Sequence, residues 1–334
     1  MPSIKDIAVD TSLSIATISK HLNGQRIKFE NAAIIDESVK RLNYKVNEAA
    51  RTLKTNKTMT IGALGPALYD GFCAKVLQDI EQSFAKAGYS MIICDYLNQS
   101  DLMLDKLDLL MSKRVDGLII FPIHNDEVLK RLREIDIPMV IIDQILGDDF
   151  DSVLIDNETA SYNATRHLIE CGHRDIGIIC GTKTSYTSRL RLQGYIRALM
   201  EAGLPVKENY IKHGGYALED GYDITMSLFG GEDVPTALYA TTYYLTLGAV
   251  LAVQSMNIAI GQDISIVGFD NLEFTQVVRP SLTMVVQPMK DISDAAYDIL
   301  HRRLNKETFD CVQKILPTEI LYKDSVKRIN IPGQ

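Results

Sequence analysis

The sequence predicts a small all-α head followed by a larger α/β body of two lobes, each a doubly wound parallel sheet. Three observations support this fold class. Residues 1–44 show only short helical patterns, whereas apolar strand-like runs alternate with helical stretches from residue 60 onward. The length of 334 residues is also too large for one ordinary hydrophobic core.

The head is predicted to contain three short helices. Ser3 precedes the helical pattern IKDIAVD, and Ser14 precedes IATISKHL, which Asn-Gly at 23–24 ends. A third helix is expected over about 30–43, with its inward-facing side formed by Ile34, Ile35, Val39 and Leu42. Two short helices joined by about four residues and closed by a third form a helix-turn-helix pattern.

The segment KVNEAARTLKTNKTMT, residues 45–60, is polar and carries few core residues. It contains one short helical piece, Asn47–Lys54, which Asn47 is placed to cap. A helix of this length is too short to persist alone in water, so we expect a linker that becomes ordered only with partners.

The body alternates between apolar runs and helical patterns. Strands are predicted at TIGALG, SMIICD, GLIIF, PMVIID, IGIIC, TALYA and ISIVGFD. Helices are predicted at Val76–Ala87, Leu102–Lys113, Ala160–Cys171, Arg189–Ala202 and Leu247–Met256. Continuous apolar strands separated by helices are typical of parallel sheets covered on both faces. Ligands of such sheets bind beyond the carboxyl ends of the strands.

Charge is distributed unevenly along the chain. Residues 1–60 carry a net charge of +4, and the remainder carries −12. A basic head on an acidic body indicates that the head meets a polyanion. The second helix of a helix-turn-helix places its N-terminal residues on base edges, which here are Ile15, Ala16 and Thr17. Ser14 and Lys20 are placed to reach phosphate or a base.

A three-helix packing module without DNA contact is the structural alternative for the head. Other function classes have weaker support. His167, Cys171 and His173 have metal-like spacing, but the end of a helix at Gly172, where a histidine is favoured, is the better explanation. No nucleophile elbow, phosphate loop or HExxH motif occurs, so we expect neither an enzyme nor a cofactor. The sequence has no membrane-length apolar run and no signal peptide, and its five cysteines are scattered. These features predict a cytoplasmic protein that does not contact membranes.

The order of motifs resembles the LacI/GalR family of bacterial transcription regulators. The resemblance rests on SIKDIA, LSIATISKHLNG and RLNYKVNEAARTLKT in the head and linker. It continues through TIGALGP, RVDGLIIFP, DNETASYNATRHLIECGHRDIGII, RLRLQGY, DISIVGFDN and RPSLTMVVQP in the body. It covers about residues 3–325.

The resemblance implies a head at 1–45, a hinge at 46–59 and a periplasmic-binding-protein-like core at 60–334 that binds effector and dimerises. Lobe one would comprise about 60–157 and 290–318, and lobe two about 158–289 and 319–334. It also implies a homodimer on a palindromic double-stranded operator, with Leu53 wedged into the minor groove beside the small Ala50. The DNA-binding set further includes Asn23, Tyr44, Asn47 and Lys54. Val46 stands where the family usually has proline before the hinge helix.

The resemblance further implies a sugar-like small effector in the core, with Arg191 and Asp270 as its main polar contacts. Asp143 is a further acidic position, and Phe72 and Tyr216 are aromatic ones. The family's frequent Asn-Asp pair is replaced by Thr242-Tyr243, and the first loop reads PALYDGF. These departures leave the effector open among phosphorylated sugars, sugar acids and glycosides.

The resulting prediction is an effector-controlled, sequence-specific DNA-binding regulator, most simply a repressor of carbohydrate-use genes. Whether the effector induces or corepresses stays open, as does dimer against tetramer. A family regulator controlled by a phosphorylated carrier protein is the alternative. A sugar-binding carrier without DNA function is a more distant one, because it leaves residues 1–60 unexplained.

Overall fold

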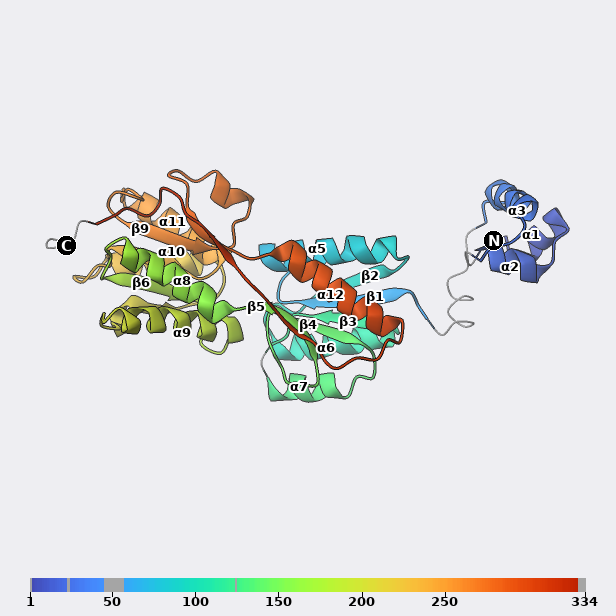
Figure 1. Cartoon of the computed structure of the whole chain (residues 1–334), viewed down its shortest axis with the longest axis horizontal. Coiled ribbons are helices and arrows are strands. Elements are labelled where there is room, and N and C mark those ends of the chain that lie inside the picture. Colours follow the sequence, from blue (N-terminus) through green and yellow to red (C-terminus); the bar gives the residue numbers. More distant parts are fainter. Residues whose placement is uncertain (1, 23–24, 45–56, 124, 330–334) are drawn as a thin grey trace. The chain divides into compact units, whose positions relative to one another are not determined.

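The computed structural model describes the chain except for residues 1, 23–24, 45–56, 124 and 330–334. It divides into two compact units, Met1–Thr58 and Met59–Gln334, which we describe separately. Figure 1 labels their helices and strands.

The first unit is a three-helix head. Helices α1 (Ile4–Thr11), α2 (Ile15–Leu22) and α3 (Phe29–Arg41) pack around Ile7, Ile18 and Ile35, which are fully buried. The Asp6 carboxylate accepts hydrogen bonds from the Ser3 amide (2.7 Å) and hydroxyl (2.8 Å) at the start of α1. The predicted helix-turn-helix pattern is therefore present, with a three-residue turn between α1 and α2.

One predicted core residue of the head is wrong. Ile34 was expected to face inward, but it is 46% exposed. Each residue of an α-helix turns by about 100°, so Ile34 lies outside the arc that runs through Ile35, Val39 and Leu42. The inner position one turn after Ile35 belongs to Ser38, which is buried and donates a hydrogen bond to Asp10.

Lobe one of the second unit is a six-stranded sheet in the order β11-β5-β4-β3-β1-β2, with every neighbouring pair parallel. Its strands are β1 (Thr60–Gly65), β2 (Ser90–Asp95), β3 (Gly117–Ile120), β4 (Met139–Ile142), β5 (Asp151–Ile155) and β11 (Gln313–Leu316). Helices α5 (Gly71–Lys86) and α12 (Met289–Leu304) pack together on one face, and α6 (Ser100–Ser112) and α7 (Asp126–Arg133) cover the other (Figure 1).

Lobe two repeats this plan in the order β12-β10-β9-β8-β6-β7. Its strands are β6 (Ile176–Cys180), β7 (Ile211–His213), β8 (Ala237–Ala240), β9 (Ser265–Phe269), β10 (Thr283–Val286) and β12 (Glu319–Leu321). Only β12 is antiparallel to its neighbour. Helices α8 (Asn157–Glu170) and α9 (Tyr186–Glu201) cover one face, and α10 (Leu218–Phe229) and α11 (Tyr243–Ser255) the other (Figure 1).

Three chain crossings join the two lobes. The chain leaves lobe one between β5 and α8, returns between β10 and α12, and crosses again between β11 and β12 (Figure 1). The residues at the first two crossings, Asn157 and Gln287, are both buried.

All seven strands predicted from apolar runs exist, but five others were missed: β5, β7, β10, β11 and β12. The predicted helices α5, α8, α9 and α11 each begin three to five residues earlier than expected, because a polar capping residue, and not the first apolar residue, sets the start. Helices α7, α10 and α12 were also missed. None of the helices in the described part of the chain has the length and apolar character needed to cross a bilayer.

Candidate functional site

A cavity of about 400 Å³ opens between the two lobes of the second unit. Its walls are the segments that directly follow the carboxyl ends of strands in both sheets, as expected for doubly wound folds. All six predicted effector residues line it: Phe72, Asp143, Arg191, Tyr216, Thr242 and Asp270. The volume falls in the range of small-molecule sites.

Asp143 and Asp270 occupy equivalent places in the two lobes. Asp143 follows β4, and its amide donates to the Val153 carbonyl at 3.0 Å; Asp270 follows β9 and donates to Val285 at 2.9 Å. Both have left-handed backbone conformations, with φ of 69° and 66°. Such conformations are unfavourable for residues other than glycine and concentrate at functional sites.

Arg191 lies on α9 and is only 4% exposed. Its Nε donates to the Asn157 side-chain oxygen at 2.8 Å, and its Nη1 donates to the Thr241 carbonyl at 2.6 Å. The guanidinium also lies 3.7 Å from the centre of the Phe269 ring. These contacts hold the group rigidly and, within the described residues, leave Nη2 for a ligand.

Burial controls the protonation of the two aspartates. Desolvation raises the pKa of Asp143 to about 7, with the charges of Asp270 and Asp70 adding to the rise and Arg191 and Asn157 opposing it. Desolvation likewise raises the pKa of Asp270 to about 6, against Arg191 and Gln287. The pocket thus holds carboxyl groups that change charge near neutral pH.

Two acceptor atoms in the pocket are buried without a partner among the described residues: Asp143 Oδ1 and Gln287 Oε1. The Gln287 amide nitrogen donates to Asp270 at 2.7 Å, which fixes its oxygen as the free end. A buried acceptor without a donor is unfavourable, so both atoms favour a ligand rich in N–H or O–H groups.

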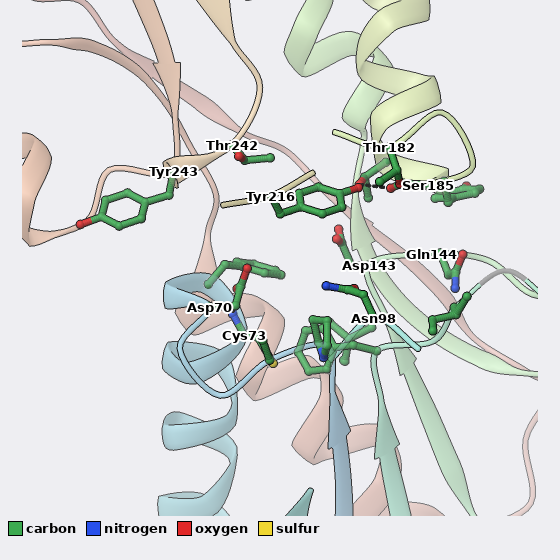
Figure 2. A pocket seen from close by; sticks show the side chains of 18 of the residues that line it. Asp70, Cys73, Asn98, Asp143, Gln144, Thr182, Ser185, Tyr216, Thr242 and Tyr243 are labelled. Carbon is green, nitrogen blue, oxygen red and sulfur yellow. Dashed lines mark hydrogen bonds between the residues drawn. The ribbon is translucent and has the colours of Figure 1, made fainter. Parts of the chain in front are cut away.

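The remaining predicted side chains shape the cavity. In Figure 2 the Tyr216 ring lies across the cavity above Asp143, with its hydroxyl directed toward Ser185 and Thr182. Glycine is required at Gly181, because a Cβ there would meet the Tyr216 ring at 2.3 Å. Phe72 packs edge-on against another lining ring, and Thr242 caps α11 by accepting from the Leu245 amide.

Several functional candidates were missed by sequence reasoning. Asp70 lines the pocket and caps α5 by accepting from the Cys73 amide at 2.8 Å. It was missed because the helix was expected to begin at Val76. At the mouth, the Tyr244 hydroxyl of lobe two donates to the Tyr69 carbonyl of lobe one at 2.9 Å. No local sequence signal reports this bond, because 175 positions separate its ends.

The head exposes the predicted N-terminal face of α2. Ser14, Ile15, Ala16 and Lys20 are exposed, and Ile15 keeps 45% of its surface in solvent although it is apolar. Ser14 Oγ accepts from the Thr17 amide at 3.1 Å, so it caps α2, and the two hydroxyls lie 2.9 Å apart. The apolar and hydroxyl groups expected to read DNA are therefore presented together.

Other predicted DNA contacts have a different status. Tyr44 packs against the head core beside Leu42. Asn23, Asn47, Ala50, Leu53 and Lys54 lie outside the described residues.

The histidine and cysteine cluster at the end of α8 has a structural explanation. His173 is buried, its Nδ1 lies 3.0 Å from the Thr236 hydroxyl, and burial lowers its pKa to about 4. His167 packs against the Tyr322 ring. The part of the chain that the structure describes holds no group of three or more side chains placed to bind a metal ion.

Comparison with known proteins extends these observations. The family model described as "Periplasmic binding proteins and sugar binding domain of LacI family" matches residues 58–324. Catabolite control protein A of Priestia megaterium is 33% identical over 329 residues, covering 97% of this chain and 99% of that protein. The HTH-type transcriptional repressor PurR of Proteus mirabilis (strain HI4320) is 35% identical over 311 residues, covering 91% of each.

Among solved structures, the Lac repressor dimer bound to operator and the anti-inducer ONPF matches with a TM-score of 0.88 at 22% identity. That match covers 98% of this chain and 99% of the other, and it establishes the fold. A two-lobed, periplasmic-binding-protein-like core with a helix-turn-helix head defines the class as a ligand-responsive transcriptional regulator. The chain belongs to the LacI family, which confirms the predicted resemblance.

Proposed function

We propose that this protein is a sequence-specific repressor of carbohydrate-use genes that a small sugar-like effector controls. The observation that carries the proposal is the cavity between the lobes, in which Arg191, Asp143 and Asp270 offer a donor and acceptors side by side. Sugar hydroxyls need both kinds of partner. The family model that matches this region is described as sugar binding, which supports the same ligand class.

The proposal divides the work along the chain. Residues 1–45 bind the operator, 46–59 form a hinge, and 60–334 bind effector and dimerise. Two copies of the chain bind the two halves of a palindromic operator, and the exposed face of α2 enters the major groove. The matched Lac repressor structure is itself a dimer bound to operator, which supports this assembly.

Effector control would act through the chain crossings. Arg191 is bonded to Asn157 at the first crossing, and Asp270 is bonded to Gln287 at the second. A ligand that engages Arg191 and Asp270 therefore contacts side chains that are bonded to residues at two of the three chain crossings. Its effect on operator binding can be no larger than its differential affinity for the two arrangements of the lobes.

The protein would act by binding and not by catalysis, as its named relatives are regulators. Because its proposed target is operator DNA, we place its action in the cytoplasm.

A thermal-shift screen of the full chain against sugars, sugar phosphates and sugar acids tests the effector class, since a ligand that binds only the folded state raises the melting temperature. A band-shift titration with the promoter of its own transcription unit then gives the sign of the response. A chain that binds no operator fragment under any ligand condition would contradict the regulator assignment.

The hinge proposal predicts the outcome of Leu53→Ala. Removing the side chain that would wedge into the central base step should weaken operator binding by about tenfold or more, because the bend it supports is lost. Band-shift titration measures the affinity, and sedimentation checks that the dimer persists. Leu97→Ala is the control. It truncates a leucine that is exposed on the surface of lobe one, and it should leave operator affinity unchanged. Equal affinities for both variants would exclude the wedge.

A second candidate controller is a phosphorylated carrier protein, as the notable identity to catabolite control protein A suggests. Under this alternative the screen gives no ligand, and adding the phosphorylated carrier protein alone strengthens operator binding. A sugar that releases the operator without any protein partner would exclude it.

A further inference from the structure

The charge in the effector pocket is unbalanced. Three carboxyl groups line it: the charges of Asp270 and Asp70 raise the pKa of Asp143, and that of Asp70 raises the pKa of Asp270. Arg191 is the only arginine or lysine among the described lining residues. Asp70 is compensated locally, since it caps α5. Asp143 and Asp270 then share one guanidinium.

The Arg191 guanidinium is bonded to groups other than the two aspartates. Its Nε and Nη1 donate to Asn157 and to a backbone carbonyl, and within the described residues no ion pair joins Arg191 to either aspartate. Asp270 receives a hydrogen bond from Gln287, but Oδ1 of Asp143 receives none. Asp143 is therefore the carboxyl group that most needs an external partner.

A second observation points to a ligand with several donors. Gln287 is 96% buried, lines the pocket, and leaves Oε1 without a donor. Its amide orientation is fixed by Asp270, so the oxygen cannot be exchanged for the nitrogen. Asp143 Oδ1 and Gln287 Oε1 both require N–H or O–H groups from the bound molecule.

The pocket is poorly suited to an anionic ligand. Helices α5, α9 and α11 begin at its wall, and helix N-termini often bind phosphate through their free amides. Here each N-terminus is already capped from within the pocket, by Asp70, Ser185 and Thr242. A phosphate or carboxylate would lie near the aspartates that line the pocket, and like charges close together in a buried site are unfavourable.

We propose that the effector is an amine-bearing carbohydrate whose ammonium group binds Asp143, while its hydroxyl groups donate to Gln287 and Asp270. This inference rests on the proposed function and makes its ligand class narrower. Nη2 of Arg191 would donate to a hydroxyl or ring oxygen of the same molecule.

The test uses the full chain and matched sets of probes. Glucosamine, galactosamine and the glucosamine disaccharide are compared with their N-acetylated forms, with glucose, galactose and cellobiose, and with glucose 6-phosphate and galactose 6-phosphate. N-acetylation keeps the nitrogen and removes the charge, so it isolates the ammonium group. Calorimetric titration at pH 7 should give at least one amine that binds about tenfold or more tightly than its N-acetyl and neutral counterparts.

Asp143→Asn provides the second arm. The variant keeps the shape of the side chain and removes its charge, so the preference for the amine over the neutral sugar should fall by about tenfold. Asp105→Asn removes the same charge from the exposed side of α6 and should keep the wild-type preference. Should the Asp143 variant fail to fold, the wild-type comparison of amine with N-acetyl form still decides the question.

The outcomes separate the two proposals. Tightest binding by a neutral or phosphorylated sugar would overturn the amine inference and leave the carbohydrate regulator standing. Silence from every probe would overturn the amine inference, and the proposed function would then be decided by its own thermal-shift screen and operator titration. An amine that binds best and loses its advantage in Asp143→Asn would support the inference.

Discussion

The two lobes have the same strand order, yet their equivalent pocket residues have different hydrogen-bond partners. Strands β4 and β9 each end in a left-handed aspartate, Asp143 and Asp270. Strands β5 and β10 each lead into a buried amide at a chain crossing, Asn157 and Gln287. The Gln287 nitrogen donates to Asp270, whereas the Asn157 oxygen accepts from Arg191.

This difference explains how two lobes with the same fold can respond differently to one ligand. The Asp270 side has its hydrogen bonds in place before any ligand arrives, so it is preorganised. The Asp143 side retains an unpartnered oxygen. We infer that a ligand first binds on the Asp270 side. Its donor groups then reach the unpartnered oxygen of Asp143, and this new hydrogen bond stabilises closure of lobe one onto the ligand.

Arg191→Ala should have the largest effect, because it removes the buried guanidinium that bonds Asn157 and whose charge lowers the pKa of both Asp143 and Asp270. Effector affinity should fall by about 100-fold or more, as expected when a buried, hydrogen-bonded charge is truncated. Calorimetry with the identified effector measures this loss. Arg189→Ala, an exposed arginine two residues earlier on the same helix, should bind normally. Comparable affinity in both variants would mean that Arg191 is only a structural tie between α9 and α8.

Asp143→Asn should change how the free energy of unfolding depends on pH, and this tests the difference between the Asp143 and Asp270 sides of the pocket. The pKa of Asp143 is raised to about 7 in the folded chain from 3.8, so the folded state holds a proton that the unfolded state has lost. Stability of the ligand-free chain therefore falls as pH rises from about 4 to 7, by up to about 1.4 kcal/mol per pH unit for such a group. The variant removes this fall.

The expected gain for ligand-free Asp143→Asn is about 4 kcal/mol at pH 8, with little change at pH 4, where the wild-type group is neutral in the folded chain. Thermal unfolding of the core at the two pH values measures it. The same gain at both pH values would show that the effect comes from packing and not from charge.

The sequence predicted the ligand-binding side chains of this pocket better than it predicted the strands and helices around them. Asp143 and Asp270 came from the family resemblance, and their place at the ends of the apolar runs PMVIID and ISIVGFD fits the carboxyl end of a buried strand. Arg191, Tyr216 and Phe72 came from the family resemblance and line the same cavity. The head helices were also found, since their caps and apolar spacing are local signals.

What was missed depends on distant pairings. Strands β11 and β12 carry exposed residues and exist because they pair with β5 and β10 across more than a hundred and about forty positions of sequence, respectively. Gln287 and Asn157 look like ordinary polar residues, and only the chain crossings bring them to Asp270 and Arg191. Local patterns cannot report contacts of this kind.

Gln287→Leu should separate binding from response. The variant removes the hydrogen bond that ties Asp270 to the second chain crossing. The ratio of effector affinities without and with operator should shrink by about tenfold, within the usual size of an allosteric coupling. Gln144→Leu is the matched control, because Gln144 is also buried, lines the same pocket and bonds a carbonyl within lobe one. A ratio that stays at the wild-type value would show that coupling does not pass through this crossing.

Tyr244→Phe should have the smallest effect, because its cross-lobe bond lies at the partly exposed mouth of the pocket. A hydrogen bond of this kind contributes about 0.5–1.5 kcal/mol, so the effector should dissociate about two- to tenfold faster. Stopped-flow dissociation measures the rate. Tyr222→Phe removes a hydroxyl whose partner, Ser255, lies in the same lobe, and it should leave the rate unchanged. If both variants release the effector at the wild-type rate, closure depends on the Asp143 side of the pocket alone; if both are faster, the loss reflects tyrosine packing and not a bond between lobes.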